Sequence, residues 1–186
     1  LATAGLIGAE VAARVVAANA LAERNIFRAT THNKGILNGV VAAAVAVGQD
    51  TRAIEAAAHA FTPFRDGNYG PLTRYALMEN GRVLRGEIEL PLALGVCGRV
   101  TASNPVYASN LHLLGDPDAR ELACILAAVG LAQNLAALRA LVTEGIQKGH
   151  MHLHSRNTAA AAGDEATEAE ESAHSESISK IRPEEI

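Results

Sequence analysis

One short segment gathers residue types that could do chemistry. The segment from Arg28 to Gly39 places cationic, hydroxyl and amide side chains around Lys34, directly before the most apolar run of the chain. We take Asn33 as the N-cap of the helix that this run predicts, which puts Lys34 in the first turn, where the helix dipole disfavours a cation. A lysine kept there is a candidate for charge-dependent chemistry, and a solvated lysine at a helix start explains the pattern equally well.

The elements that must position these groups are several helices and one hairpin. Apolar residues at helical spacing predict helices over residues 8–23 and 34–47, the second apolar on nearly all sides and therefore buried. Gly35 and Gly39, four residues apart on that helix, would let another backbone approach closely. The expected fold class is α+β: helix-dominated, with a buried central helix and an antiparallel hairpin.

The other boundaries come from turn and cap residues. Strands over 72–79 and 82–90 flank Asn80-Gly81, which is a strong hairpin signal, and residues 62–70 are typical of a loop. Asp50 can cap a helix over 51–60, and Asp116-Pro117 opens a long helix to about Gly145. A last helical piece is expected over 150–162.

Composition and charge divide the chain and exclude some partners. Of the 20 acidic and 16 basic residues, residues 164–186 hold eight acids and two bases, which leaves 12 acids and 14 bases in residues 1–163. We therefore expect a domain over 1–163 and an acidic tail over 164–186, flexible or a frayed helix. No basic patch with aromatics predicts nucleic-acid binding, and no uninterrupted apolar run reaches the length of a membrane span. Cys97 and Cys124 have no metal or redox spacing, and we expect free buried thiols in a cytosolic protein.

A series of motifs resembles the family of 3-hydroxy-3-methylglutaryl-CoA (HMG-CoA) reductases, in their soluble class II form. The resemblance covers residues 5 to 158 in order and rests on the segment 28–39, Gly48-Gln49-Asp50, Arg52-Ala53-Ile54-Glu55, Ala58-His59-Ala60, Gly70-Pro71-Leu72-Thr73, Glu87-Ile88-Glu89-Leu90-Pro91, Gly130-Leu131-Ala132-Gln133-Asn134, Leu138-Arg139-Ala140-Leu141 and Glu144-Gly145-Ile146-Gln147-Lys148-Gly149-His150-Met151. It implies part of the large, substrate-binding domain of a cytoplasmic homodimer or higher homo-oligomer. It also implies reduction of HMG-CoA to mevalonate and free coenzyme A, or the reverse, with NADPH or NADH.

The resemblance also implies roles for individual residues. Lys34 matches the family's cation beside the reacting carbonyl, and Asp50 the carboxylate that hydrogen-bonds this lysine; Asp50 can cap a helix at the same time. His150 matches the histidine that protonates the departing thiolate of coenzyme A, although without the flanking match an ordinary polar helix-end residue would be favoured. Substrate contacts are implied for four residues: Arg28, Thr31, Asn38 and Gln133. For Asn38 and Gln133, inside apolar helices, the alternative is a buried amide satisfied by backbone.

Some expected parts do not occur in this sequence. The family's glutamate motif, of the Glu-Asn-Val-Ile-Gly type, and its cofactor segment, of the Asp-Ala-Met-Gly-Ala-Asn type, are expected upstream of Leu1, as part of a longer chain. We therefore expect little activity from these 186 residues alone. A truncated remnant or pseudoenzyme that dimerises and binds acyl-CoA is the alternative. His150 and His154 share a helix face, but Met151 replaces the glutamate of a zinc-protease motif, so no metal is expected.

Overall fold

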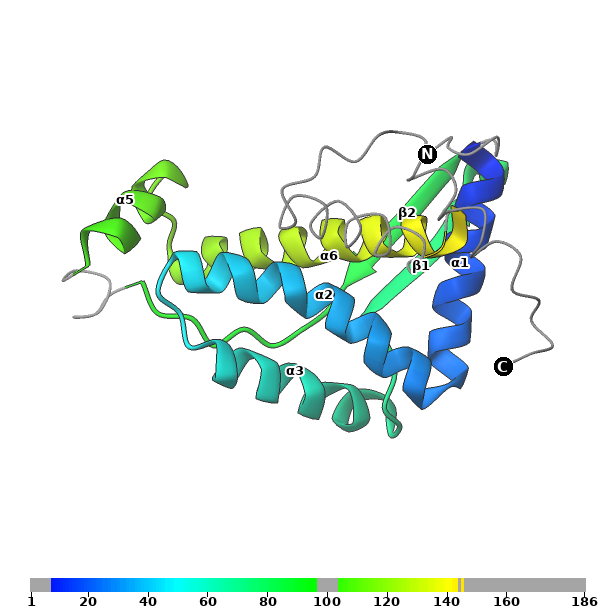
Figure 1. Cartoon of the computed structure of the whole chain (residues 1–186), viewed down its shortest axis with the longest axis horizontal. Coiled ribbons are helices and arrows are strands. Elements are labelled where there is room, and N and C mark those ends of the chain that lie inside the picture. The colour runs from blue at the N-terminus through cyan, green and yellow to red at the C-terminus, as the bar shows by residue number, and fades with distance from the viewer. Residues whose placement is uncertain (1–7, 97–103, 144, 146–186) are drawn as a thin grey trace, which may run out of the picture. The chain divides into compact units, whose positions relative to one another are not determined.

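A computed structural model describes residues 8–96, 104–143 and 145 (Figure 1). Two long helices, α2 (Ile26–Ala46) and α6 (Ala119–Thr143), run side by side. Helix α1 (Gly8–Arg24) contacts both, and α3 (Thr51–Asp66) packs against α2. The described residues thus form a helix-dominated α+β unit.

One antiparallel hairpin completes the unit. Strands β1 (Thr73–Met78) and β2 (Val83–Ile88) pair from Thr73 opposite Ile88 to Met78 opposite Val83, and the short 3₁₀ turn η1 (Glu79–Gly81) joins them. Asn80 and Gly81 both have positive φ, 53° and 86°, which is the conformation that their types allow most readily. The predicted hairpin is confirmed. By backbone proximity, β1 lies mainly against α1 and β2 against α6.

The main apolar cluster lies where α2, α3 and α6 meet. Ile36, Val40 and Ala44 of α2 are fully buried in it, together with Ile54 of α3 and Leu122 of α6. Full burial of a valine, leucine or isoleucine side chain contributes about 1.5–3 kcal/mol to the stability of the fold. The predicted buried central helix is confirmed on the face that meets α3 and α6, whereas Ala42, Val45 and Ala46 on its outer face are exposed in a single copy of the chain.

The start of α2 also differs from the prediction. The N-cap is Asn25, whose side chain accepts a hydrogen bond from Arg28 N at 2.9 Å, and the helix continues without interruption through Asn33 and Lys34. Lys34 therefore lies in the middle of a helix, where the dipole argument for a perturbed lysine does not apply. The run of polar residues looked like a helix start, but both faces of α2 need polar groups at this point.

Other boundaries moved by a few residues. Helix α3 continues through Pro63 to Asp66, beyond the predicted end, and closes on Gly67, with φ of 74° and its N–H bonded to Pro63 O. Asp118 rather than Asp116 caps α6, accepting from Arg120 N and Glu121 N at 2.8 Å. A helix that was not predicted, α5 (Pro105–Leu113), begins at the cap Asn104. The predicted helix over 150–162 and the tail lie outside the described residues.

Helix α6 is long and apolar enough to cross a membrane by length and composition alone. Counting uninterrupted apolar runs missed this, because Gln133 and Asn134 divide the stretch. One face of the same helix is buried through Leu122, Leu126 and Leu138 and packs along α2 and β2, although most of its residues are not buried. The composition of α6 is therefore weak evidence for a span.

Candidate active site

The polar residues singled out on α2 share one outward face. Arg28, Thr31, Lys34 and Asn38 follow one another at intervals of three or four residues, which places them in a stripe along the helix. Thr31, Lys34 and Asn38 are exposed and Arg28 is half-buried. Three of the four candidate substrate residues are thereby brought together with the candidate catalytic lysine.

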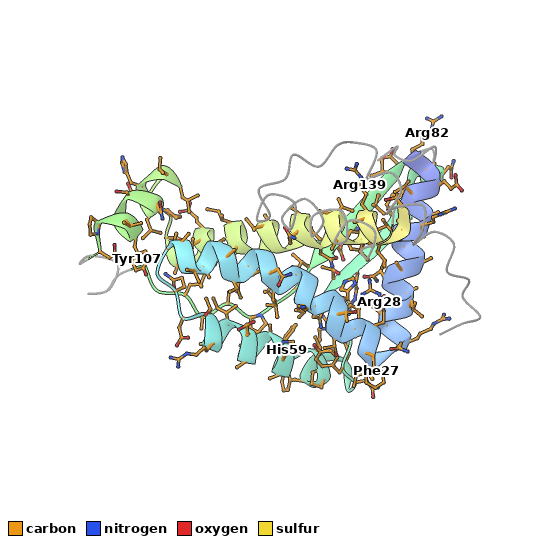
Figure 2. The ribbon with its side chains drawn as sticks, viewed as in Figure 1. Phe27, Arg28, His59, Arg82, Tyr107 and Arg139 are labelled. Atoms are coloured by element: carbon orange, nitrogen blue, oxygen red, sulfur yellow. The ribbon has the colours of Figure 1, made fainter. Side chains whose placement is uncertain are left out.

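Arg28 and Thr31 form the ordered end of this stripe. The Arg28 guanidinium donates to Thr31 Oγ1 at 3.0 Å, and the Thr31 hydroxyl donates to Arg28 O at 3.0 Å. Burial lowers the pKa of Arg28 from its ordinary value. Figure 2 shows Arg28 and Phe27 at the beginning of α2, beside the corner with α1. The remaining guanidinium N–H groups suit the two oxygens of a carboxylate.

Asn38 and Gln133 lie on neighbouring helices at the same level. A Cβ on Gly39, the residue after Asn38, would come within 2.8 Å of Gln133 Cβ. Both amides are exposed, so the alternative of a buried amide satisfied by backbone is wrong for both. They interrupt apolar sequence because they stand on the outer faces of α2 and α6. Exposed donors at this level are available to a ligand.

Asp50 stands away from Lys34. Its side chain caps α3 by accepting from Arg52 N at 3.1 Å and Ala53 N at 3.2 Å, as predicted, and lies 3.7 Å from the Arg52 guanidinium. From Lys34 to the end of α2 at Ala46 the helix rises about 18 Å. A lysine side chain does not span that distance, so one copy of the chain does not bring these two groups together.

Three further residues were predicted to have a role or a burial state: His150, Cys124 and Cys97. His150 lies outside the described residues. Cys124 is an exposed free thiol on α6, which contradicts the prediction of a buried one; it occupies the outer face of a helix whose inner face carries Leu122 and Leu126. Cys97 is outside the described residues.

Two polar residues lie on the inner face of α2: His32, for which the sequence predicts no role, and Asn33, which the sequence predicts as a helix cap. Asn33 is fully buried: its Nδ2 donates to Gly70 O at 2.9 Å and to Tyr69 Oη at 3.2 Å, and its Oδ1 accepts from Leu72 N at 2.9 Å. His32 is 2% exposed, and burial, followed by the nearby charge of Arg28, lowers its pKa to about 4. Periodicity counted from Asn25 would have placed both with the apolar residues Ala29 and Ile36.

A cavity of about 370 Å³ is lined by the end of α1, the end of α3, the segment that follows α3 and the start of β1. Three of its charged groups already pair: Arg65 donates to Asp66 and Glu89, and Arg74 lies 3.5 Å from Asp66. The lining residues are Glu23, Arg65, Asp66, Asn68, Tyr69, Gly70, Pro71 and Arg74. No residue of the α2 stripe lines it.

Comparisons with known proteins agree with one family. The family model described as hydroxymethylglutaryl-coenzyme A reductase matches residues 1–155. The 3-hydroxy-3-methylglutaryl-coenzyme A reductase of Archaeoglobus fulgidus is 51% identical over 156 residues, which are 84% of this chain and 35% of the relative. A probable 3-hydroxy-3-methylglutaryl-coenzyme A reductase of Borreliella burgdorferi is 45% identical over 127 residues, 68% of this chain and 29% of the relative. The chain thus spans about a third of the length of these relatives.

Solved structures show the same fold. The class II 3-hydroxy-3-methylglutaryl-CoA reductase from Streptococcus pneumoniae, a structure bound to NADPH in open conformations, is 44% identical. It matches with a TM-score of 0.71 over 94% of this chain and 42% of its own. With the family model covering residues 1–155 and the fold shared with a class II enzyme, this chain belongs to the hydroxymethylglutaryl-coenzyme A reductase family.

Proposed function

We propose that this chain is the part of a class II HMG-CoA reductase that binds the acyl group of the substrate and carries the catalytic lysine. The reaction is the reduction of HMG-CoA to mevalonate and free coenzyme A, or its reverse. The observation that supports this role is the exposed stripe of Arg28, Thr31, Lys34 and Asn38 on α2, with Gln133 of α6 at the level of Asn38. One cation for a carboxylate, one for an oxyanion and several neutral donors suit a hydroxymethylglutaryl thioester.

Lys34 is proposed to stabilise the negative oxygen. Each reduction step turns a carbonyl carbon tetrahedral and leaves charge on its oxygen, and a preorganised cation lowers the energy of that state. The α2 backbone is held from the opposite face by buried Asn33 and His32, so the Lys34 Cα has a fixed position. In other enzymes, removal of one hydrogen-bond donor to a developing oxyanion lowers kcat by on the order of 10²–10³-fold.

His150 and Asp50 complete the proposed chemistry. Coenzyme A leaves as a thiolate, whose thiol has an ordinary pKa near 8.5. A histidine with an ordinary pKa near 6.5 can donate the proton that it needs. Asp50 is proposed to accept a hydrogen bond from the lysine ammonium and so to hold its charge.

A nicotinamide cofactor, NADPH or NADH, supplies the two hydrides in this family. Its diphosphate favours free N–H groups at a helix start. The starts of α2, α3, α5 and α6 are each closed by a cap side chain, and two of these caps are carboxylates: Asn25, Asp50, Asn104 and Asp118. We therefore propose that the diphosphate of the cofactor is bound by other residues of the protein.

A second copy of the chain would bring Asp50 to Lys34. Both residues are eight positions from Ala42 along the sequence, and Ala42 is exposed on the outer face of α2 beside Asn38 and Val45. If two α2 helices pack antiparallel about a twofold axis at Ala42, Lys34 of one copy faces the α3 start of the other. We thus propose a cytoplasmic homodimer whose site uses both copies.

The dimer is tested by cross-linking. Ala42→Cys should form an intersubunit disulfide under mild oxidation, because a residue on a twofold axis meets its own copy. Arg82→Cys, at the far end of the hairpin (Figure 2), should stay monomeric on the same gel. A dimer that forms without the Ala42→Cys cross-link would contradict this arrangement.

The activity is tested on a protein extended to the length of its relatives. Cofactor oxidation should depend on HMG-CoA, and Lys34→Ala should lower kcat by on the order of 10²-fold or more. Arg82→Ala removes one cation outside the stripe and should leave kcat unchanged. We expect little turnover from the 186 residues alone. An extended protein without HMG-CoA-dependent oxidation would favour the non-catalytic remnant that binds acyl-CoA.

A further inference from the structure

A buried chain of hydrogen bonds joins three elements behind the proposed site. His32 Nε2 of α2 lies 2.5 Å from Thr73 Oγ1 of β1, and the Thr73 hydroxyl donates to Asn134 Oδ1 of α6 at 3.1 Å. The Tyr75 hydroxyl donates to the same oxygen at 3.1 Å. These four side chains are between 0% and 7% exposed. A buried chain of this kind restricts the relative positions of the elements that it connects.

The directions of the hydrogen bonds determine the tautomer of His32. Thr73 has one hydroxyl proton, and that proton goes to Asn134 Oδ1, which only accepts. Thr73 therefore accepts from His32, so His32 carries its proton on Nε2. Its Nδ1 is buried and has no hydrogen-bond partner among the described residues. All the polar stabilisation of this ring thus comes through Thr73.

Each end of the chain is the sequence neighbour of a proposed substrate residue. His32 follows Thr31 and precedes Lys34 by two positions, and Asn134 follows Gln133. Adjacent residues of a helix point about 100° apart, because a turn takes 3.6 residues. The chain therefore holds the inner faces of α2 and α6 while their outer faces carry the exposed groups.

We propose that His32, acting through Thr73 and Asn134, is a positioning residue that sets the rotation and register of α2 against α6 and so places Lys34 relative to Gln133. This inference rests on the proposed function. To the proposed site it adds His32, a buried residue that touches neither substrate nor cofactor. Thr73 is the part to perturb, since Thr73→Val keeps the shape and removes the link, whereas Thr73→Ser restores the hydroxyl.

The register can be measured without any activity. A Cβ on Gly35 would stand 3.6 Å from Ala137 Cβ, within the range for a disulfide, so the pair Gly35→Cys and Ala137→Cys should close readily. Adding Thr73→Val should slow closure at least tenfold, and Thr73→Ser should restore it. Tyr75→Phe removes one buried bond but leaves the link from His32 to Asn134 intact, so it controls for general loss of stability. Equal closure rates with and without Thr73→Val would overturn the proposal.

The effect on the site is measured in the extended protein. Thr73→Val should raise KM for HMG-CoA at least tenfold and leave KM for the cofactor within twofold, whereas Thr73→Ser should return the first value to within threefold. A purely structural loss of folded protein would lower the rate and move neither KM. Slower closure with an unchanged KM for HMG-CoA would also overturn the proposal. If the parent protein does not turn over HMG-CoA, the proposed function fails, and the closure rates still decide the register.

Discussion

Gly35 and Gly39 face α6 from the same side of α2, yet substitution by alanine should have opposite effects on stability. A Cβ on Gly39 would lie 2.8 Å from Gln133 Cβ and 3.3 Å from the Val129 carbonyl oxygen. A Cβ on Gly35 would meet only Ala137 Cβ, at 3.6 Å, which is ordinary van der Waals contact. The helices are therefore in closest contact near Gly39 and have room at Gly35.

The magnitude follows from two terms. Alanine is favoured over glycine inside a helix by about 1 kcal/mol, and this gain applies at both positions. At Gly35 nothing opposes it, so Gly35→Ala should raise the free energy of unfolding by about 0.5–1 kcal/mol. At Gly39 a 2.8 Å contact must be relieved by separating the helices, and overpacking of this kind costs about 1–3 kcal/mol. Gly39→Ala should thus be net destabilising, and the two variants should differ by about 2 kcal/mol.

Urea denaturation of the 186-residue chain and both variants measures this difference. Helix content followed by circular dichroism gives the midpoint, and equal m-values are needed for a valid comparison. The reasoning would be refuted if Gly39→Ala were as stable as Gly35→Ala, because the close approach of α2 and α6 would then not exist.

Three other predictions concern the buried and capping groups. The pKa of His32 is about 4 in the folded chain and near 6.5 in the unfolded chain, which binds more protons between these values. The free energy of unfolding should therefore fall by about 3 kcal/mol as the pH falls from about 6.5 to about 4. His32→Gln should make the urea midpoint less dependent on pH in this range, and an unchanged dependence on pH would contradict the prediction. Asn33→Ala strands Leu72 N and Gly70 O and should cost about 3 kcal/mol, against less than about 0.5 for exposed Asn38→Ala. Asn25→Ala should lower the free energy of unfolding by about 1 kcal/mol, because α2 loses its N-cap. An unchanged urea midpoint would show that α2 does not begin at Asn25.

The sequence predicted elements best where the local signal was physically sufficient. Asn80-Gly81 fixed the hairpin because positive φ at both residues is accessible to few other pairs. Asp50 was predicted as a cap because a carboxylate directly before a helix can accept hydrogen bonds from the first free N–H groups of that helix. The start of α2 was misplaced because Asn33 has the residue type of a cap, whereas its hydrogen bonds go to the distant backbone of Leu72 and Gly70. Contacts between residues nearly forty positions apart leave no local pattern.

The residue types of the candidate site were predictable from resemblance, but their orientation was not. Asn38 and Gln133 had two readings, buried amide or ligand donor, and only the phase of each helix decides between them. That phase comes from tertiary packing: Gly39 lies against Gln133, and Gly130 lies so close to Val40 that a Cβ there would come within 2.7 Å. Local sequence does not specify which side of an apolar helix meets its neighbour.

The segment around Lys34 is polar because the same turns of α2 carry polar side chains on both the exposed and the buried face. Thr31 and Lys34 point outward, where ions are solvated and a ligand can reach them, whereas His32 and Asn33 point inward. An inward polar group costs about 1–3 kcal/mol when it is unpaired, so the inner residues require partners on other elements. The partners are backbone before β1 and side chains of β1 and α6. A change at Thr73 should therefore shift Lys34 although the two residues are not in contact. If the inner face of α2 were made of apolar side chains alone, the helix would still form, but its position would no longer depend on Thr73.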